Sequence, residues 1–411
     1  MRIASSASTD STRRSRFLPG YVVLTIGITL IGIGLSITRP YLSLFGTDVI
    51  HMSPAGLGIF MCMNALGGIV ASTWLGRMSD TRTPKKDVML FSSVMAGLGY
   101  ASFLVFHDYL VLLAVSTVLL GLGSATFPQM FAYARESTLL SPNVDATFAI
   151  TTLRSFFSLA WVIGPMAGVL LLNALGYNGL FTMTSAIFAA VFVIVLFFLK
   201  RRSVVVPNGA RPAGVFTYLK QVDVLMSCVS FVAVYTASSI NGSYMSLFIT
   251  QTLHAPEHDV GWVFSLSAGL EIPIMLGLGT IANRVGKRML LLFGSICGTG
   301  YYVGAAFAHT VWQMLALQLV CAVFISISVS IGMSYMQDFM PDAPGSATTL
   351  YSNTNNIGSM AGSLIGGAIA QAFGFRALYV FCAALGAISY FLLLRRRTEQ
   401  SREVVEHVKR G

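Results

Sequence analysis

Charged residues are scarce in this sequence. Only 10% of its 411 residues are Asp, Glu, Lys or Arg, whereas an ordinary soluble domain is about 25% charged. Hydrophobic residues make up 55% of the chain. A chain of this composition cannot keep a water-facing surface along its whole length, so the sequence excludes an ordinary soluble globular protein.

Cysteine is also sparse, and its placement excludes two kinds of site. The five cysteines lie in apolar segments without a CxxC pair or ligand-spaced histidines, at Cys62, Cys228, Cys297, Cys321 and Cys382. We interpret them as small core residues rather than as disulfides or metal ligands.

The sequence also lacks a Walker loop. We therefore expect no metal, no cofactor and no enzymatic activity, and we do not expect ATP to be the energy source.

Long apolar stretches are what the sequence has most of. A hydrocarbon core of about 30 Å requires about 20 apolar residues in a helix. Twelve stretches of this kind are present, at 20–46, 54–76, 87–107, 109–134, 146–174, 179–199, 221–250, 258–282, 288–308, 311–338, 346–373 and 376–394. The sequence thus predicts an all-α polytopic membrane protein with twelve transmembrane helices.

The basic residues predict the orientation of these helices. Of the 26 Lys and Arg residues, 23 fall in the two tails and in alternate loops. The positive-inside rule then places both termini in the cytoplasm. The net charge of +10 is explained by this topology and by contact with anionic lipid headgroups, and we expect no nucleic-acid partner.

The chain reads as two similar halves. We divide it into a cytoplasmic tail (1–19), a six-helix bundle (20–199), a cytoplasmic linker (200–220), a second six-helix bundle (221–394) and a cytoplasmic tail (395–411). Gly76-Arg-Met-Ser-Asp80 is echoed by Gly279-Thr-Ile-Ala-Asn283, and Ile163-Gly-Pro165 by Ile365-Gly-Gly367. Two pseudo-symmetric bundles are typical of secondary transporters, in which one bundle rocks against the other around a central site.

Two sets of sequence strings resemble known families. The stretch from Gly279 to Arg288, Gly-Thr-Ile-Ala-Asn-Arg-Val-Gly-Lys-Arg, is similar to the loop signature of the major facilitator superfamily, with Asn283 in place of Asp. Longer strings resemble the bacterial sugar efflux transporters: Phe127-Pro-Gln-Met-Phe131, Ser158-Leu-Ala-Trp-Val-Ile-Gly-Pro165, Ala268-Gly-Leu-Glu-Ile-Pro273, Met336-Gln-Asp-Phe-Met-Pro341 and Ala347-Thr-Thr-Leu350.

The resemblance implies a major facilitator fold and export of small sugars or glycosides, such as lactose and glucose, across the bacterial inner membrane. It also implies proton antiport, and we expect a monomer. A multidrug-proton antiporter is the nearest alternative. A membrane sensor or channel without coupled transport is an alternative of another class.

Three strongly ionisable residues lie well inside predicted helices: Arg39, Arg154 and Glu271. Such residues are costly in hydrocarbon and should face the bundle interior with a partner. We expect Arg154 and Glu271, at similar depths in the fifth and eighth helices, to form a salt bridge between the bundles in one access state. Separating them would favour protonation of Glu271, the only carboxylate near mid-membrane, although the pair could also be a gate without proton traffic. For Arg39, beside Pro40, we favour an anchor at the outer surface over substrate contact.

A sugar site needs amide and hydroxyl groups and an aromatic platform. The polar and aromatic candidates within predicted helices are Gln129, Ser158, Trp161, Tyr235, Asn241, Tyr244, Gln318, Asn353, Asn355 and Asn356. The alternative for each amide is that it joins helices to one another.

Small residues and rim charges complete the predicted machinery. Gly164, Pro165 and Gly168 on one helix, and Gly358 and Gly362 on another, predict close helix approach and bending. By resemblance to the superfamily, rim charges at the cytoplasmic ends would act as latches. We expect Asp80 to reach Arg135, and Arg284 or Lys287 to approach Asp338 with reversed polarity. Ordinary solvated pairing is the alternative.

Overall fold

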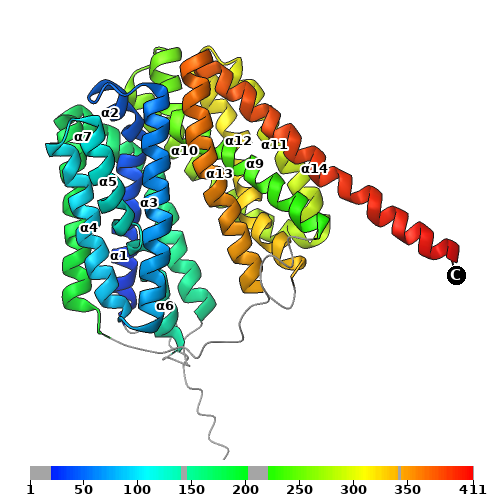
Figure 1. Ribbon diagram of the computed structural model, residues 1–411, viewed down its shortest axis with the longest axis horizontal. Helices are drawn as coiled ribbons and strands as arrows, with labels where there is room; N and C mark the ends of the chain where they lie inside the picture. The colour runs from blue at the N-terminus through cyan, green and yellow to red at the C-terminus, as the bar shows by residue number, and fades with distance from the viewer. Residues whose placement is uncertain (1–19, 140–145, 202–220, 341–343, 411) are drawn as a thin grey trace, which may run out of the picture.

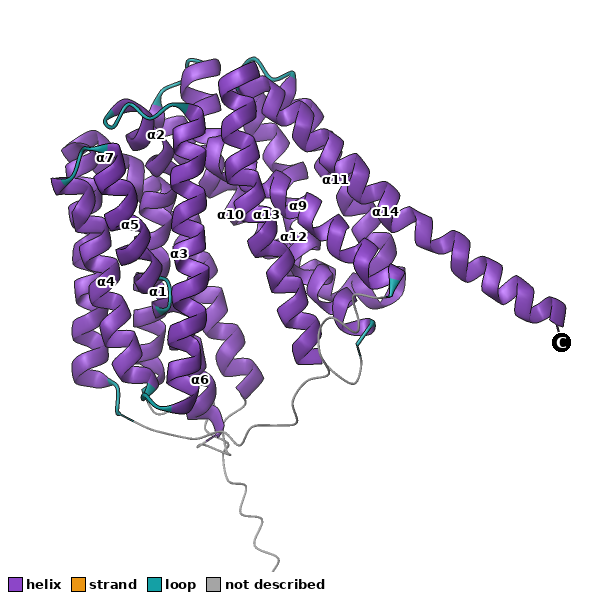
Figure 2. Ribbon diagram, in the orientation of Figure 1, coloured by secondary structure: helices purple, strands orange, loops and turns teal. Residues whose placement is uncertain are grey.

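The computed structural model describes residues 20–139, 146–201, 221–340 and 344–410. Figure 2 shows helices and no strand in this described part of the chain. The predicted all-α class is therefore confirmed. The predicted tail 1–19 and nearly all of the predicted linker lie outside the described residues.

The helices fall into two groups, one in each half of the chain. The N bundle contains α1 (Tyr21–Thr38), η1 (Arg39–Tyr41), α2 (Leu42–Asp48), α3 (Pro54–Thr81), α4 (Lys85–Val105), α5 (Tyr109–Gly123), α6 (Thr126–Leu139) and α7 (Ala146–Phe198). The C bundle contains α9 (Val222–Leu247), the π-helical turn η2 (Phe248–Thr252), α10 (Glu257–Val285), α11 (Lys287–Ala306), α12 (Val311–Asp338), α13 (Pro344–Phe373) and α14 (Phe375–Arg410).

Two predicted helices are interrupted. The first changes to the short 3₁₀ turn η1 at Arg39–Tyr41, because Pro40 cannot donate a backbone hydrogen bond. The predicted helix 109–134 is divided between α5, which ends at Gly123, and α6, which begins at Thr126. Pro128 is tolerated here because it lies in the first turn of α6.

Helix length and composition favour many membrane crossings. Among the described residues, ten helical stretches are long and apolar enough to cross a membrane. The 53 residues of α7 would span about 80 Å, and Gly176, with a φ of 66°, breaks their helical geometry. The break falls between the predicted helices 146–174 and 179–199. The protein is therefore a multi-pass membrane protein, while the count of twelve stays a prediction.

The two bundles lie side by side and meet along two helix pairs. Figure 1 shows the blue-to-green N bundle beside the green-to-red C bundle. Helix α3 packs against α13, and α7 packs against α10. The bundles are close at the end where α2 lies, and they diverge toward the end where α6 lies (Figure 1). These two helix pairs form the seam between the bundles.

A repeated contact supports the internal duplication. In the N bundle, Lys86 Nζ donates to the carbonyl oxygens of Leu196 and Leu199 at 2.8 and 2.7 Å. In the C bundle, Arg288, which stands 202 positions after Lys86, donates to the carbonyl oxygen of Leu393 at 2.7 Å. Each cation thus satisfies carbonyl groups at the end of the last membrane helix of its bundle.

Candidate functional site

The seam is sealed at one end of the molecule by neutral hydrogen bonds. Ser246 Oγ of α9 donates to the carbonyl oxygen of Pro40 at 2.5 Å. The backbone N–H of Ala55 donates to Gln371 Oε1 at 3.2 Å. We call this end, where residues 40–58 meet the C bundle, the closed end.

Two glycines allow α3 and α13 to touch at the closed end. A Cβ on Gly58 would lie 2.4 Å from the carbonyl oxygen of Ser363, and a Cβ on Gly367 would lie 2.6 Å from that of Pro54. These separations are shorter than real Cβ contacts. Any larger residue at Gly58 or Gly367 would push the two bundles apart.

The other pair in the seam, α7 and α10, follows the same pattern. Tyr41 Oη donates to the carbonyl oxygen of Pro165 at 2.6 Å, and a Cβ on Gly261 would lie 3.0 Å from Tyr41 Oη. Farther along the seam, a Cβ on Gly269 would lie 3.7 Å from Val162 Cγ1. We call the opposite end, where residues 77–86 and 284–288 lie, the open end.

A pocket of about 240 Å³ lies between the bundles near the closed end. Its N-bundle wall includes Thr38, Arg39, Asn64 and Tyr100, and its C-bundle wall comes from α9 and α13. The full lining is Leu35, Thr38, Arg39, Leu42, Phe60, Met61, Asn64, Ala65, Tyr100, Ser239, Gly242, Ser243, Ser359 and Ser363. Both bundles thus contribute to one polar pocket, as a central site between rocking bundles requires.

The pocket bears on the role of Arg39. The sequence favours an anchor at the outer surface, and the structure places Arg39 in the pocket lining. The 3₁₀ turn at Pro40 lies at the seam, since the Pro40 carbonyl accepts from Ser246 of the other bundle. Arg39 is exposed in this conformation, so both the anchor and substrate contact stay predictions for it.

Arg154 and Glu271 have separate surroundings in this conformation. Ser267 Oγ donates to Glu271 Oε1 at 3.4 Å, and Ser326 Oγ donates to the Glu271 carbonyl at 3.3 Å. Arg154 is exposed on α7. Among the ion pairs of the described residues, none includes Arg154 or Glu271, so their predicted pairing stays a prediction for another state.

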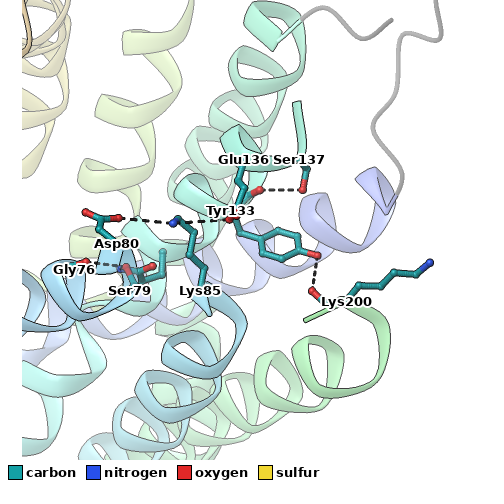
Figure 3. Close-up of polar contacts among 9 residues, drawn as sticks. Gly76, Ser79, Asp80, Lys85, Tyr133, Glu136, Ser137 and Lys200 are labelled. Carbon is teal, nitrogen blue, oxygen red and sulfur yellow. Dashed lines mark hydrogen bonds and ion pairs between the residues drawn. The ribbon is translucent and has the colours of Figure 1, made fainter. Parts of the chain in front are cut away.

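The rim charges at the open end form matching pairs in the two halves, and Figure 3 shows the contacts of the N bundle. In the N bundle, Lys85 Nζ lies 3.7 Å from Asp80 Oδ1 and 3.8 Å from Glu136 Oε2. In the C bundle, Lys287 Nζ lies 2.6 Å from Asp338 Oδ1.

The expected pairing of Asp80 with Arg135 stays a prediction, but the described ion pairs include one of like polarity in each half. Lys287 and Asp338 stand 202 positions after Lys85 and Glu136, respectively, so the described contacts have the same polarity in both halves. Arg284 is exposed, and it is Lys287 that approaches Asp338. The pairing of Lys85 is not predicted by the sequence, because Lys85 directly follows the loop, where a basic residue is explained by topology alone.

Comparison with known proteins identifies the family. A model described as Major Facilitator Superfamily matches residues 24–226 and 226–410. Sugar efflux transporter B of Salmonella typhimurium is 34% identical over 89% of this chain and 93% of its own length. Sugar efflux transporter A of Escherichia coli is 31% identical over 90% of this chain and 95% of its own. The chain belongs to the sugar efflux transporters of the Major Facilitator Superfamily.

More distant similarities within the superfamily support the same fold. Multidrug resistance protein MdtG of Serratia proteamaculans is 24% identical over 93% of this chain and 95% of its own. The crystal structure of the nucleoside transporter NupG superposes with a TM-score of 0.80 at 13% identity, over 91% of this chain and 98% of that one. The major facilitator fold expected from the loop signature is therefore confirmed.

Several polar candidates of this superfamily member form hydrogen bonds within one bundle. Gln129 Nε2 donates to Ser79 Oγ at 2.9 Å. Asn241 Oδ1 accepts from Tyr301 Oη at 2.9 Å, and the buried Gln318 donates to a carbonyl of its own helix. In this conformation, helix joining describes Gln129 and Asn241 better than ligand contact does, whereas the hydrogen bond of Gln318 stays within its own helix.

The remaining candidates divide into buried tyrosines and accessible polar residues. Tyr235 donates to Tyr351 Oη, and Tyr244 donates to the Ser363 carbonyl at 3.0 Å, so both tyrosines brace α9 against α13. The candidates that are partly or fully exposed are Ser158, Trp161, Asn353, Asn355 and Asn356. None of the predicted substrate residues is in the lining of the pocket described here.

The predicted glycine stripes pack helices within a bundle. A Cβ on Gly164 would overlap Ser36 of α1, and a Cβ on Gly168 would lie 2.4 Å from the Ile37 carbonyl. The close neighbours of Gly358 and Gly362 are on α9, where a Cβ would lie 2.6 Å from Tyr235 Cβ and from the Thr236 carbonyl oxygen, respectively. Pro165 lies at the seam, where its carbonyl accepts from Tyr41.

Proposed function

We propose that this protein exports small sugars or glycosides across the bacterial inner membrane by alternating access. The polar pocket shared by both bundles carries this proposal, because hydroxyl and amide groups beside Phe60 and Tyr100 suit a sugar's hydroxyls and ring face. The names of the relatives at 31–34% identity support the same substrate class.

The distribution of basic residues supports an assignment of the two ends. The loops at the open end carry Arg77, Lys85, Lys86, Arg284 and Lys287. By the positive-inside rule this end faces the cytoplasm. The conformation would then be open inward and sealed outward, which is the state in which an exporter takes up its cargo.

We propose further that Arg154 and Glu271 meet when the open end closes. Val162 and Gly269 mark the last described contact between α7 and α10 on the way to the open end. Arg154 lies eight residues before Val162, which places it roughly 12 Å nearer the open end. Glu271 lies just two residues beyond the facing Gly269. If the open end closed without sliding, Arg154 and Glu271 would still be offset along the helix axes by about six residues, or roughly 9 Å. Pairing therefore also requires α7 to slide along α10.

Proton antiport would use Glu271 as the carrier. A carboxylate that pairs with Arg154 in one state and faces only Ser267 in the other would take up a proton on separation. Replacing Glu271 by Gln should abolish pH-gradient-driven transport in proteoliposomes and spare substrate exchange. Gradient-driven uptake at the wild-type rate would remove Glu271 from the coupling role and leave a gate without proton traffic.

The ion pairs of Asp80 and Asp338 at the rim are candidates for latches, which would break and then form again across the two bundles as the open end closes. Among the described contacts they join helices of one bundle only, so any latch across the bundles would belong to the outward-open state.

Counterflow of labelled lactose in proteoliposomes tests the function directly. Vesicles loaded with unlabelled lactose should accumulate label transiently if the protein carries the sugar. Vesicles with the Gly367→Leu variant provide the control, because a leucine there would hold the closed end apart. Label that enters only to equilibrium would indicate a channel, absence of entry would indicate a sensor, and efflux of a cationic dye without lactose counterflow would indicate a multidrug antiporter.

A further inference from the structure

Arg39 brings a permanent positive charge into the pocket between the bundles. Guanidinium cannot be deprotonated in proteins, and charges within membrane helices are expensive unless they are paired or functional. Among the ion pairs of the described residues none includes Arg39. The pocket lining contains no Asp or Glu. Arg39 is exposed in this conformation, so its charge is accessible to an anion that enters the pocket.

Asn64 adds an acceptor without a partner in the same pocket. Its Nδ2 donates to the carbonyl oxygen of Phe60 at 2.8 Å, which uses one donor of the amide and leaves Oδ1 to be satisfied. That oxygen is buried and has no hydrogen-bond partner. A buried acceptor without a donor is unfavourable, so Asn64 is suited to accept a hydroxyl group from a ligand.

The C-bundle wall supplies hydroxyl groups. Ser239 Oγ donates to the Ser359 carbonyl at 3.0 Å, and Ser363 Oγ donates to the same carbonyl at 3.0 Å. Since each hydroxyl proton is already used, the Oγ lone pairs remain available to accept from a ligand. The two walls together offer one cation and several neutral acceptors.

The charge and size of the pocket narrow the ligand class. A volume of about 240 Å³ is below the roughly 300–1,000 Å³ of pockets for drug-sized ligands, so a single sugar ring suits it better than an oligosaccharide. Arg39 is the one charged residue in its lining. A carboxylate can pair with one guanidinium through two parallel hydrogen bonds, whereas a phosphate monoester carries a charge of about −1.5 to −2 and would remain partly uncompensated.

We propose that this pocket selects a monosaccharide acid, with Arg39 binding its carboxylate and Asn64 Oδ1 accepting one of its hydroxyls. The proposal rests on the proposed sugar transport and specifies its substrate class. A neutral sugar of the same size would fit the pocket but would leave the guanidinium without an anion.

Glucuronate and glucose provide a matched test, because they differ only in a carboxylate at carbon 6. Binding to the purified full-length protein is measured by the ligand-dependent shift in unfolding temperature, with glucose 6-phosphate as a third probe. We expect glucuronate to bind at least tenfold more tightly than glucose. Arg39→Gln should bring the ratio near one, and Arg39→Lys should retain part of it.

Two further variants separate recognition from general damage. Arg77→Gln removes an exposed arginine of α3 outside the pocket lining and should keep the wild-type ratio. Asn64→Ala should weaken both sugars to a similar extent, because it removes an acceptor for hydroxyls that they share.

Equal binding of the two sugars to the wild-type protein would overturn the proposal, as would a preference that survives Arg39→Gln. Tighter binding of glucose 6-phosphate than of glucuronate would overturn the assignment to a carboxylate. Lactose counterflow without any acid preference would reject this inference and leave sugar transport standing. Absence of both counterflow and binding would reject both.

Discussion

Replacing Gly58 by alanine should unseal the closed end. Its added Cβ would lie 2.4 Å from the Ser363 carbonyl and 3.1 Å from Gly367 Cα. Both of these neighbours are backbone atoms, which cannot rotate away as a side chain can. Restoring an ordinary separation of about 3.4 Å requires α3 and α13 to part by about 1 Å at this point.

The overlap of the added Cβ destabilises only the conformation in which the closed end is sealed. Overpacking a well-packed contact typically costs about 1–3 kcal/mol, and each 1.4 kcal/mol changes an equilibrium tenfold. The sealed conformation should therefore lose a factor of about 5 to 150 relative to one in which the closed end is parted. Transport should slow, because the cycle needs both states.

Distances between spin labels on the two bundles would measure the shift. Cysteines at Leu110 and Phe373, which are 69% and 77% exposed, would carry the labels in a variant whose five native cysteines are replaced. Gly58→Ala should populate a longer distance. Gly300→Ala is the control, because nothing lies within 4 Å of its Cβ position. A Gly58→Ala distribution indistinguishable from that of Gly300→Ala would refute the idea that this glycine permits sealing.

Two other comparisons test contacts within the bundles, one of ion pairs and one of glycine packing. Lys85→Met should lower the unfolding free energy by about 1–3 kcal/mol, because Lys85 is only 10% exposed and lies between two carboxylates. Lys287→Met should lower it by at most about 1 kcal/mol, because the equivalent pair is more exposed. Equal losses in thermal unfolding would contradict this ranking by burial. Gly362→Leu should abolish lactose counterflow but not membrane insertion, because a Cβ there would lie 2.6 Å from the Thr236 carbonyl. A fully active protein, at the level of Gly300→Leu, would count against close packing of α13 on α9.

The helical fold could be predicted because its physical cause is local. The length of an apolar stretch and the placement of Lys and Arg do not depend on how helices pack. The interruption between Gly123 and Thr126 was missed because it depends on the close approach of α5 to α4, where a Cβ on Gly123 would lie 2.7 Å from Ala96. That approach leaves no trace in hydropathy.

The candidate site was harder to predict because sequence does not reveal how each helix is rotated in its bundle. Asn241 and Gln318 attracted attention as amides, yet they bond inside the C bundle. Asn64 and the serines of the pocket carry a weaker signal, since Ser is common in membrane helices. An intramembrane asparagine such as Asn64 was nevertheless a signal that could have been followed.

The hydrogen bonds across the closed end join neutral groups, such as Ser246 with Pro40 and Ala55 with Gln371. The ion pairs that the structure describes each join residues of a single bundle. Mobile ions weaken exposed charge pairs but leave neutral contacts and close glycine packing largely untouched. Asp48 of α2 and Glu257 of α10 also bring like charges near each other at this end, and mobile ions screen that repulsion. The closed end should therefore stay sealed at high salt at least as firmly as in dilute buffer.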